Sequence, residues 1–199
     1  MKKTWLIVAI IALLLGVGTR YLIDQPEPEM AKLPQAALGQ LSTNGQPINL
    51  YNQQDSRIRI AYFGYTHCPD VCPTSLAILS AALREFSPQT LDKIWPIFIT
   101  LDPERDTSEK AQEYANYFHP NITGMTGTMQ QTKQLADTYG VLYAKAKLEG
   151  SAMEYSVDHN SYFYFLKPDG TLIEKVPHTL DPAPIIEVVN NLLSSQGEP

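Results

Sequence analysis

The chain's two cysteines lie four residues apart, in the segment Cys68-Pro-Asp-Val-Cys72. Residues with this spacing share one face of a helical turn, so both sulfur atoms can face one metal ion or each other. A closed loop this short constrains the unfolded chain little, which makes a purely structural disulfide a weak use of the pair. The spacing therefore predicts a redox couple, a pair of soft metal ligands, or both.

The segments on either side of the cysteines indicate how they are held. Residues 58–63 are mostly apolar and predict a strand, and apolar residues at helical spacing follow the pair at Leu76, Leu79, Leu83 and Phe86. The cysteines then open a helix, whose N-terminus carries partial positive charge and favours a thiolate. A thiolate both binds metals and attacks disulfides, so this position suits either use.

His159 is the third candidate, because it directly precedes an expected aromatic strand. Thioredoxin-like oxidoreductases place a cis-proline before the strand that faces their cysteines, whereas residues 155–161 contain no proline. Two thiolates and an imidazole suit Cu(I) and can accept Cu(II), while structural zinc needs four ligands, and the sequence has neither a second cysteine pair nor two histidines at zinc-site spacing. We therefore predict one copper ion per chain, held by Cys68, Cys72 and His159, with Asp158 orienting the imidazole.

Several other side chains are weaker candidates. His67 could be a fourth ligand or tune the neighbouring thiol, but is expected to point away from the site. His119 is expected at a helix end, His178 in a loop without a partner, and Met153 in a hairpin as an ordinary contact. The charged turn at residues 102–106 either caps the next helix and pairs internally, or helps to shape a partner surface.

The rest of the chain predicts an α/β fold, in which helices cover both sides of a central sheet. Asn44-Gly45 indicates a hairpin near the N-terminus of the domain. A nearly all-apolar strand is expected at 94–101, and a last helix from Asp181-Pro182. Capping boxes are expected where two further helices begin, at Asp106-x-x-Glu109 and Thr128-x-x-Gln131.

The N-terminus predicts a membrane anchor. An apolar run extends from residue 5 to 23 behind Lys2 and Lys3, which approaches the length of a bilayer span. We predict an uncleaved anchor over 1–23, a tether over 24–36 and a folded domain over 37–195, with a cleaved signal peptide as the alternative. The lysines place the N-terminus in the cytoplasm and the domain in the oxidising periplasm, where the cysteines form a disulfide unless reduced.

Charge argues against one class of partner. The net charge of the chain is −6 and no basic cluster is present, so nucleic acid is not an expected partner.

The motifs, taken in order, resemble those of the Sco/SenC copper-binding proteins. The matching segments are residues 62–73 (YFGYTHCPDVCP), 100–107 (TLDPERDT), 122–127 (ITGMTG) and 157–159 (VDH), within a similarity that covers residues 57–193. Asn160, where Ser or Thr is expected, departs from the pattern without touching a predicted ligand.

The resemblance implies a membrane-tethered, thioredoxin-like protein that binds copper through Cys68, Cys72 and His159. It also implies assembly of the dinuclear copper centre of cytochrome c oxidase, by delivering copper to its copper-bearing subunit, by reducing the cysteines of that centre, or both. Such a protein needs a copper donor or a thiol reductant as a further partner, and another cuproprotein could be the client.

Two other functions remain open. An extracytoplasmic thiol–disulfide oxidoreductase would use Cys68 and Cys72 as a redox-active pair and would scarcely need His159. A thiol peroxidase would need an arginine close to the thiolate, and the cysteine loop contains none.

Overall fold

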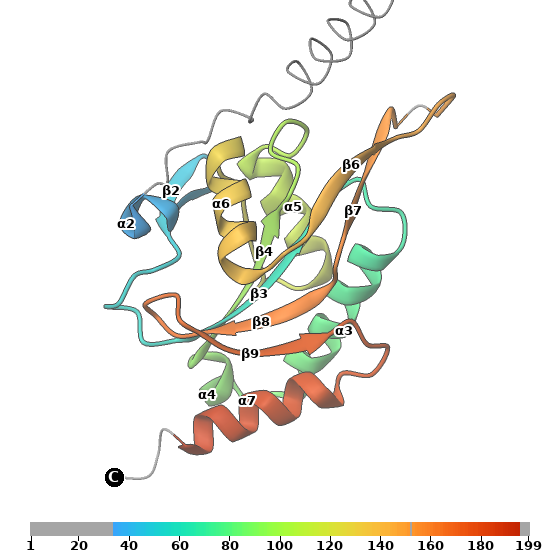
Figure 1. Ribbon diagram of the computed structural model, residues 1–199. Coiled ribbons are helices and arrows are strands. Elements are labelled where there is room, and N and C mark those ends of the chain that lie inside the picture. Colours follow the sequence, from blue (N-terminus) through green and yellow to red (C-terminus); the bar gives the residue numbers. More distant parts are fainter. Residues whose placement is uncertain (1–33, 152, 196–199) are drawn as a thin grey trace, which may run out of the picture. The chain divides into compact units, whose positions relative to one another are not determined.

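A five-stranded mixed sheet forms the centre of the protein, and its strands run in the order β5-β4-β3-β8-β9 (Figure 1). The structure, a computed structural model, describes residues 34–151 and 153–195. The predicted anchor over 1–23 and nearly all of the tether over 24–36 lie outside these residues. Within the described ranges no helix has the length and apolar character that a membrane span requires.

The sheet combines parallel and antiparallel pairs. Strand β3 pairs in parallel with β4 and β4 with β5, whereas β8 is antiparallel to both β3 and β9. The bounds of the five strands are β3 Ile58–Gly64, β4 Ile94–Thr100, β5 Thr123–Met125, β8 Tyr162–Leu166 and β9 Leu172–Pro177.

Helices cover both faces of the sheet (Figure 1). Helix α3 packs against α5 and α7, and α2 packs against α6. Their bounds are α2 Gln35–Leu38, α3 Val71–Glu85, α4 Pro88–Leu91, α5 Ser108–Phe118, α6 Met129–Tyr139 and α7 Ala183–Ser195. The predicted mixed α/β architecture is thereby confirmed.

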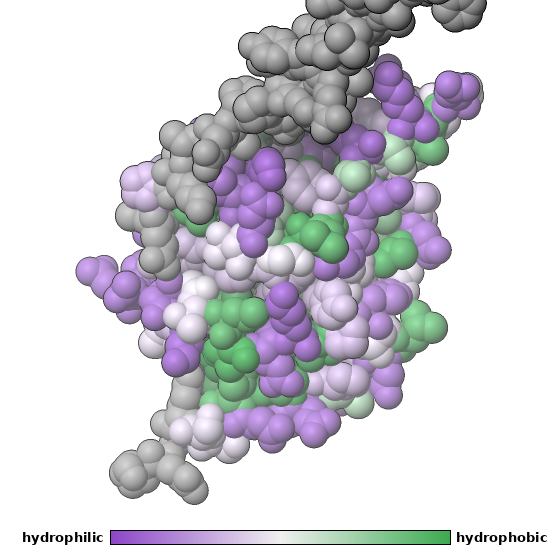
Figure 2. All heavy atoms as spheres, in the orientation of Figure 1, coloured by the Kyte–Doolittle hydropathy of each residue, from purple (hydrophilic) through white to green (hydrophobic). Residues whose placement is uncertain are grey.

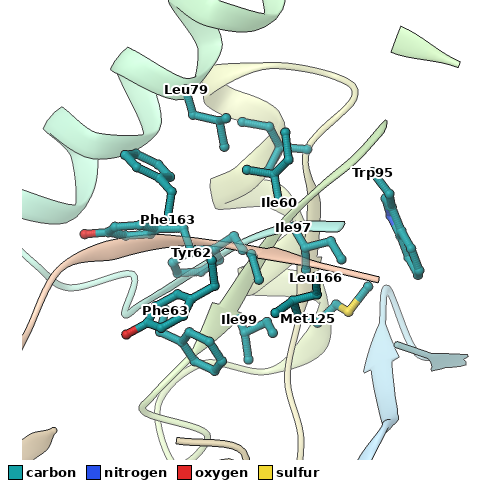
Figure 3. Close-up of a cluster of buried hydrophobic side chains, with 14 of the residues drawn as sticks. Ile60, Tyr62, Phe63, Leu79, Trp95, Ile97, Ile99, Met125, Phe163 and Leu166 are labelled. Carbon is teal, nitrogen blue, oxygen red and sulfur yellow. The ribbon is translucent and has the colours of Figure 1, made fainter. Parts of the chain in front are cut away.

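The core lies between the central strands and these helices. Every residue of β3 and of β4 is buried, as expected of strands that are covered on both faces. Figure 3 shows aliphatic and aromatic side chains from β3, β4 and β8, including Ile60, Ile97 and Phe163, packed with Leu79 of α3. This packing makes the carboxyl end of β3 a rigid base for the cysteine loop that follows it.

Two hairpins lie outside the central sheet. Strands β1 (Gln40–Thr43) and β2 (Gln46–Asn49) form the predicted N-terminal hairpin, in which Asn44 and Gly45 both adopt positive φ. Strands β6 (Tyr143–Lys147) and β7 (Tyr155–His159) form a separate two-stranded sheet, and His159 is the last residue of β7.

The expected helix starts are partly confirmed. The capping box of α6 is present as predicted, with Thr128 and Gln131 bonding reciprocally. The expected box at Asp106 is wrong: Thr107 is the N-cap of α5, and its side chain accepts from the Lys110 N–H. The Asp106 carboxylate instead accepts hydrogen bonds from Thr66 and Thr100.

Candidate metal centre

The two cysteines lie where β3 leads into α3. The backbone N–H of Cys72 points at the sulfur of Cys68, with 3.4 Å between N and Sγ. Asp70 occupies the N-cap position, but its side chain makes no capping hydrogen bond. The sulfur of Cys68 therefore takes the place of a capping oxygen at the positive end of α3.

The two thiols differ sharply in acidity. Both cysteines are free, which is the reduced state of the predicted redox couple; Cys72 is fully buried and Cys68 only partly. The thiol of Cys72 donates a hydrogen bond to Cys68 and, with backbone N–H groups of the loop, lowers the pKa of Cys68 to about 5. The same bond, together with burial, raises the pKa of Cys72. At neutral pH the pair therefore consists of a Cys68 thiolate and a Cys72 thiol.

His159 contacts Cys72 from the end of β7. Its Nε2 lies 3.4 Å from Cys72 Sγ, and its Nδ1 lies 3.1 Å from the carbonyl oxygen of Asn160. A carbonyl only accepts, so Nδ1 carries the proton and Nε2 presents its lone pair to the sulfur. Burial lowers the pKa of His159, which keeps the imidazole in the neutral form that binds metals.

The expectation that Asp158 orients this ring is wrong. Its carboxylate is exposed and accepts from the hydroxyl of Ser156, whereas the backbone of Asn160 holds the ring. Asn160 also accepts from the N–H of Leu142 and donates to the carbonyl of Gly140. The sequence suggested that Asn160 touches no predicted ligand, and the structure shows the opposite.

Aromatic rings and one glycine complete the walls around the histidine and the buried thiol. The rings of Tyr62 and Tyr65 each meet His159 edge-on, with 6.3 Å between ring centroids. A Cβ added to Gly64 would lie 2.8 Å from Cys72 Sγ, so only glycine leaves room for the buried sulfur. These neighbours fix where the sulfur and the imidazole can lie.

The structure thus brings together the three residues predicted as ligands. The contacts link Cys68 to Cys72 and Cys72 to His159. In the part of the chain that the structure describes, no three His, Cys, Asp or Glu side chains are already arranged as a metal site. The ligand set therefore stays a prediction.

The charged turn at residues 102–106 does more than pair internally. Asp106 is fully buried, and its carboxylate accepts from the backbone N–H and hydroxyl of Thr66, at 2.9 and 2.5 Å, and from the Thr100 hydroxyl at 2.6 Å. Thr66 precedes Cys68 by two residues, so this carboxylate holds the start of the cysteine loop. The position of the turn in the sequence could have indicated this role. The turn follows β4 and the cysteine loop follows β3, and these parallel neighbours end at the same edge of the sheet.

The remaining histidines have other partners. His67 Nδ1 lies 3.1 Å from the Thr66 hydroxyl and 3.5 Å from Asp106. His119 ends α5 and its Nδ1 accepts from the N–H of Asn121. His178, expected to lack a partner, lies 2.8 Å from the hydroxyl of Ser75 in α3.

Comparison with known proteins assigns the family. The model of the SCO1/SenC family matches residues 39–194. The chain belongs to the SCO1/SenC family. An SCO2-like protein of Rickettsia conorii is 32% identical over 197 residues, which cover 93% of this chain and 95% of the relative.

Solved structures agree with this assignment. Arabidopsis thaliana ScoI with copper bound has a TM-score of 0.66 and 32% identity, over 79% of this chain and 99% of that one. The solution structure of apo Sco1 from Thermus thermophilus has a TM-score of 0.68 and 32% identity, over 77% of this chain and 88% of that one. The predicted family and its thioredoxin-like, mixed α/β fold are thereby confirmed.

The acidity of Cys68 in this Sco protein can be tested directly. Because Cys68 is a thiolate above pH 5, alkylation of the reduced, metal-free chain by iodoacetamide should level off above that pH and fall about tenfold per unit below it. Cys72, buried and protonated, should not react at pH 7. Mass spectrometry of the modified peptides gives both rates, and the denatured chain is the control. A native midpoint near pH 8.5, the value of an ordinary thiol, would contradict the assignment.

Proposed function

We propose that this Sco protein binds one copper ion through Cys68, Cys72 and His159 and assembles the dinuclear copper centre of cytochrome c oxidase. The observation that carries the proposal is the contact between His159 Nε2 and Cys72 Sγ at 3.4 Å, which joins the third predicted ligand to the cysteine pair. A plain dithiol reductant has no need of an imidazole at that position. Copper is here the cargo that the protein carries.

The chemistry of these residues fits copper. Cys68 is already a thiolate, and His159 is neutral with a lone pair directed at the site. Sulfur and imidazole are the soft and intermediate donors that bind Cu(I) and also accept Cu(II). Burial of Cys72 between Gly64 and the aromatic rings shields the buried side of the site from water and from competing oxygen ligands.

The same pair supports reduction of the client's cysteines. The Cys68 thiolate attacks a client disulfide and forms a mixed disulfide, which releases one client thiolate. Cys72 then loses its proton and attacks Cys68, so that the second client thiol leaves and the two electrons of the Cys68–Cys72 pair have passed to the client. The partly exposed thiolate and the buried thiol have the acidities that this order of steps requires.

The proposed setting follows from the sequence. Residues 1–23 anchor the chain in the inner membrane with its N-terminus in the cytoplasm, and residues 24–36 tether the domain of residues 37–195 on the periplasmic side. The partners are then the copper-bearing subunit of the oxidase, or another cuproprotein, and a copper donor or thiol reductant. The alternative is an oxidoreductase that acts on a cuproprotein without carrying copper.

Copper titration tests the proposal. The full chain, reduced and free of oxygen, should bind one copper tightly, and the Cu(II) form should show thiolate-to-copper charge-transfer bands. Loss of one ligand in His159→Ala should lower Cu(II) affinity about a hundredfold and shift these bands. The matched control is His119→Ala, which removes a histidine at the end of α5 that is not among the predicted ligands.

The two proposed functions predict different results for the variant. If copper binds equally well to His159→Ala, the predicted ligand set is wrong and the thiol–disulfide function is the better one. Exchange of the Cys68–Cys72 couple with a small dithiol should in either case remain within a few-fold in His159→Ala.

A further inference from the structure

One loop contacts both halves of the metal centre. The turn between β4 and α5, residues 101–107, bonds to the cysteine loop through Asp106 and Thr66. The same turn bonds to the β6–β7 hairpin, which ends at His159, through Asp102 and Arg105. The cysteine ligands and the histidine ligand are thus joined through a single short segment.

The hairpin has few other attachments. It forms its own two-stranded sheet, and its outer part is largely hydrophilic, as Figure 2 shows at the upper right. Of the residues in β6 and β7, Val157 alone is fully buried. Tyr143 and Tyr155 pack against the core only in part, so polar contacts must supply much of the hairpin's attachment.

Arg105 makes most of these contacts. Its guanidinium donates to the carbonyl oxygens of Met153 and Tyr155, at 3.0 and 3.1 Å, and lies 3.6 Å from the centre of the Tyr155 ring. Its Nε donates to Asp102, which is fully buried and also accepts from the Tyr155 hydroxyl at 2.7 Å. Asp102, Arg105 and Tyr155 therefore form a closed set of contacts, the hairpin clamp.

A second pair reinforces the clamp at its outer side. Lys145 of β6 donates to Glu104 at 2.6 Å and lies 4.7 Å from the Tyr155 ring. Lys145 belongs to β6 and Tyr155 to β7, so both strands of the hairpin are bonded to the same turn.

We propose that Arg105 is a positioning residue of the metal centre: through the hairpin clamp it sets where the β6–β7 hairpin presents His159 to the cysteines. The inference rests on the proposed copper function. Arg105 touches no ligand, and it acts through Tyr155, which starts the strand that His159 ends. A planar guanidinium is needed, because two carbonyls, one carboxylate and one ring face are bound together.

The test compares Arg105→Met with the wild-type chain. In the reduced, metal-free protein, amide exchange across residues 143–159 should become about tenfold faster, while exchange of β8 stays unchanged. In the Cu(II)-loaded protein, copper release to a chelator should be about tenfold faster and the thiolate-to-copper band should move. Arg105→Lys keeps the positive charge but lacks the planar guanidinium. It should restore the slow hairpin exchange and the wild-type copper behaviour only in part.

Arg57→Met is the matched control. Arg57 also pairs with an aspartate, Asp55 at 2.6 Å, and lies 5.0 Å from an aromatic ring, that of Trp95. It precedes β3 and contacts neither the hairpin nor the cysteine loop. Both readouts should therefore stay at their wild-type values.

A folded Arg105→Met chain with unchanged hairpin exchange and an unchanged copper spectrum would overturn the inference. If Arg105→Met does not fold, Tyr155→Phe removes only the hydroxyl bond to Asp102 and should change both readouts in the same direction. Unchanged readouts in that variant would also overturn it. A wild-type chain that binds no copper would reject the proposed function. The amide-exchange measurement would still show whether Arg105 holds the hairpin in place.

Discussion

Serine in place of Cys72 is expected to lower Cu(I) affinity by about a hundredfold to a thousandfold. A structural four-ligand metal site contributes roughly 10–16 kcal/mol, so one ligand accounts for about 2.5–4 kcal/mol, and a hydroxyl is a poor ligand for a soft ion. The substitution should leave the fold intact, because a hydroxyl is close in size and can still donate to the Cys68 sulfur as the Cys72 thiol does. Competition with a Cu(I) chelator of known affinity measures the loss.

The control for this change is Ser80→Ala. Ser80 is buried on the same helix and donates to the carbonyl of Phe118, so its loss perturbs α3 without touching the site. Its copper affinity should equal that of the wild-type chain. If Cys72→Ser retained affinity within tenfold, Cys72 would not be a ligand, and its role would be limited to resolving a mixed disulfide.

Much of this architecture was predictable, because strong local patterns produced it. The nearly all-apolar segment that forms β4 is buried on both faces, Asn44-Gly45 adopts the positive φ that its hairpin needs, and Thr128 with Gln131 caps α6. Each of these features depends on a few neighbouring residues whose types have one favourable use. Cys68, Cys72 and His159 could be predicted as ligands for a similar reason, since few residue types bind soft metals.

What could not be predicted depends on contacts between distant segments. Gly64 lies in an ordinary strand pattern, and only the packed structure shows that its missing side chain makes room for the Cys72 sulfur. Asp158, a carboxylate next to the histidine, was the obvious partner for the imidazole, but alternation along β7 turns it outward. The capping-box pattern at Asp106 was misleading, because the carboxylate accepts hydrogen bonds from the distant Thr66 and from Thr100 instead of capping the helix.

Asp106→Ala is expected to destabilise the reduced, metal-free domain by about 3 kcal/mol, a large part of the roughly 5–15 kcal/mol of an ordinary domain. The carboxylate is fully buried and accepts three hydrogen bonds. Its removal leaves the N–H of Thr66 and the hydroxyls of Thr66 and Thr100 without their acceptor. Urea denaturation followed by circular dichroism measures the change in the free energy of unfolding.

Two further variants separate burial from charge. Asp92→Ala removes an exposed carboxylate at the end of α4 and should change the free energy of unfolding by no more than about 0.5 kcal/mol. Asp106→Asn keeps the shape of the side chain and one acceptor oxygen, but it turns an NH₂ group toward a donor. Its loss in free energy of unfolding should therefore lie between those of Asp92→Ala and Asp106→Ala.

Since Asp106 holds the start of the cysteine loop, Asp106→Ala should also speed alkylation of Cys72 at pH 7. Stability unchanged in Asp106→Ala would mean that the loop is held by β3 and α3 alone, and that the charged turn serves the histidine side of the site only.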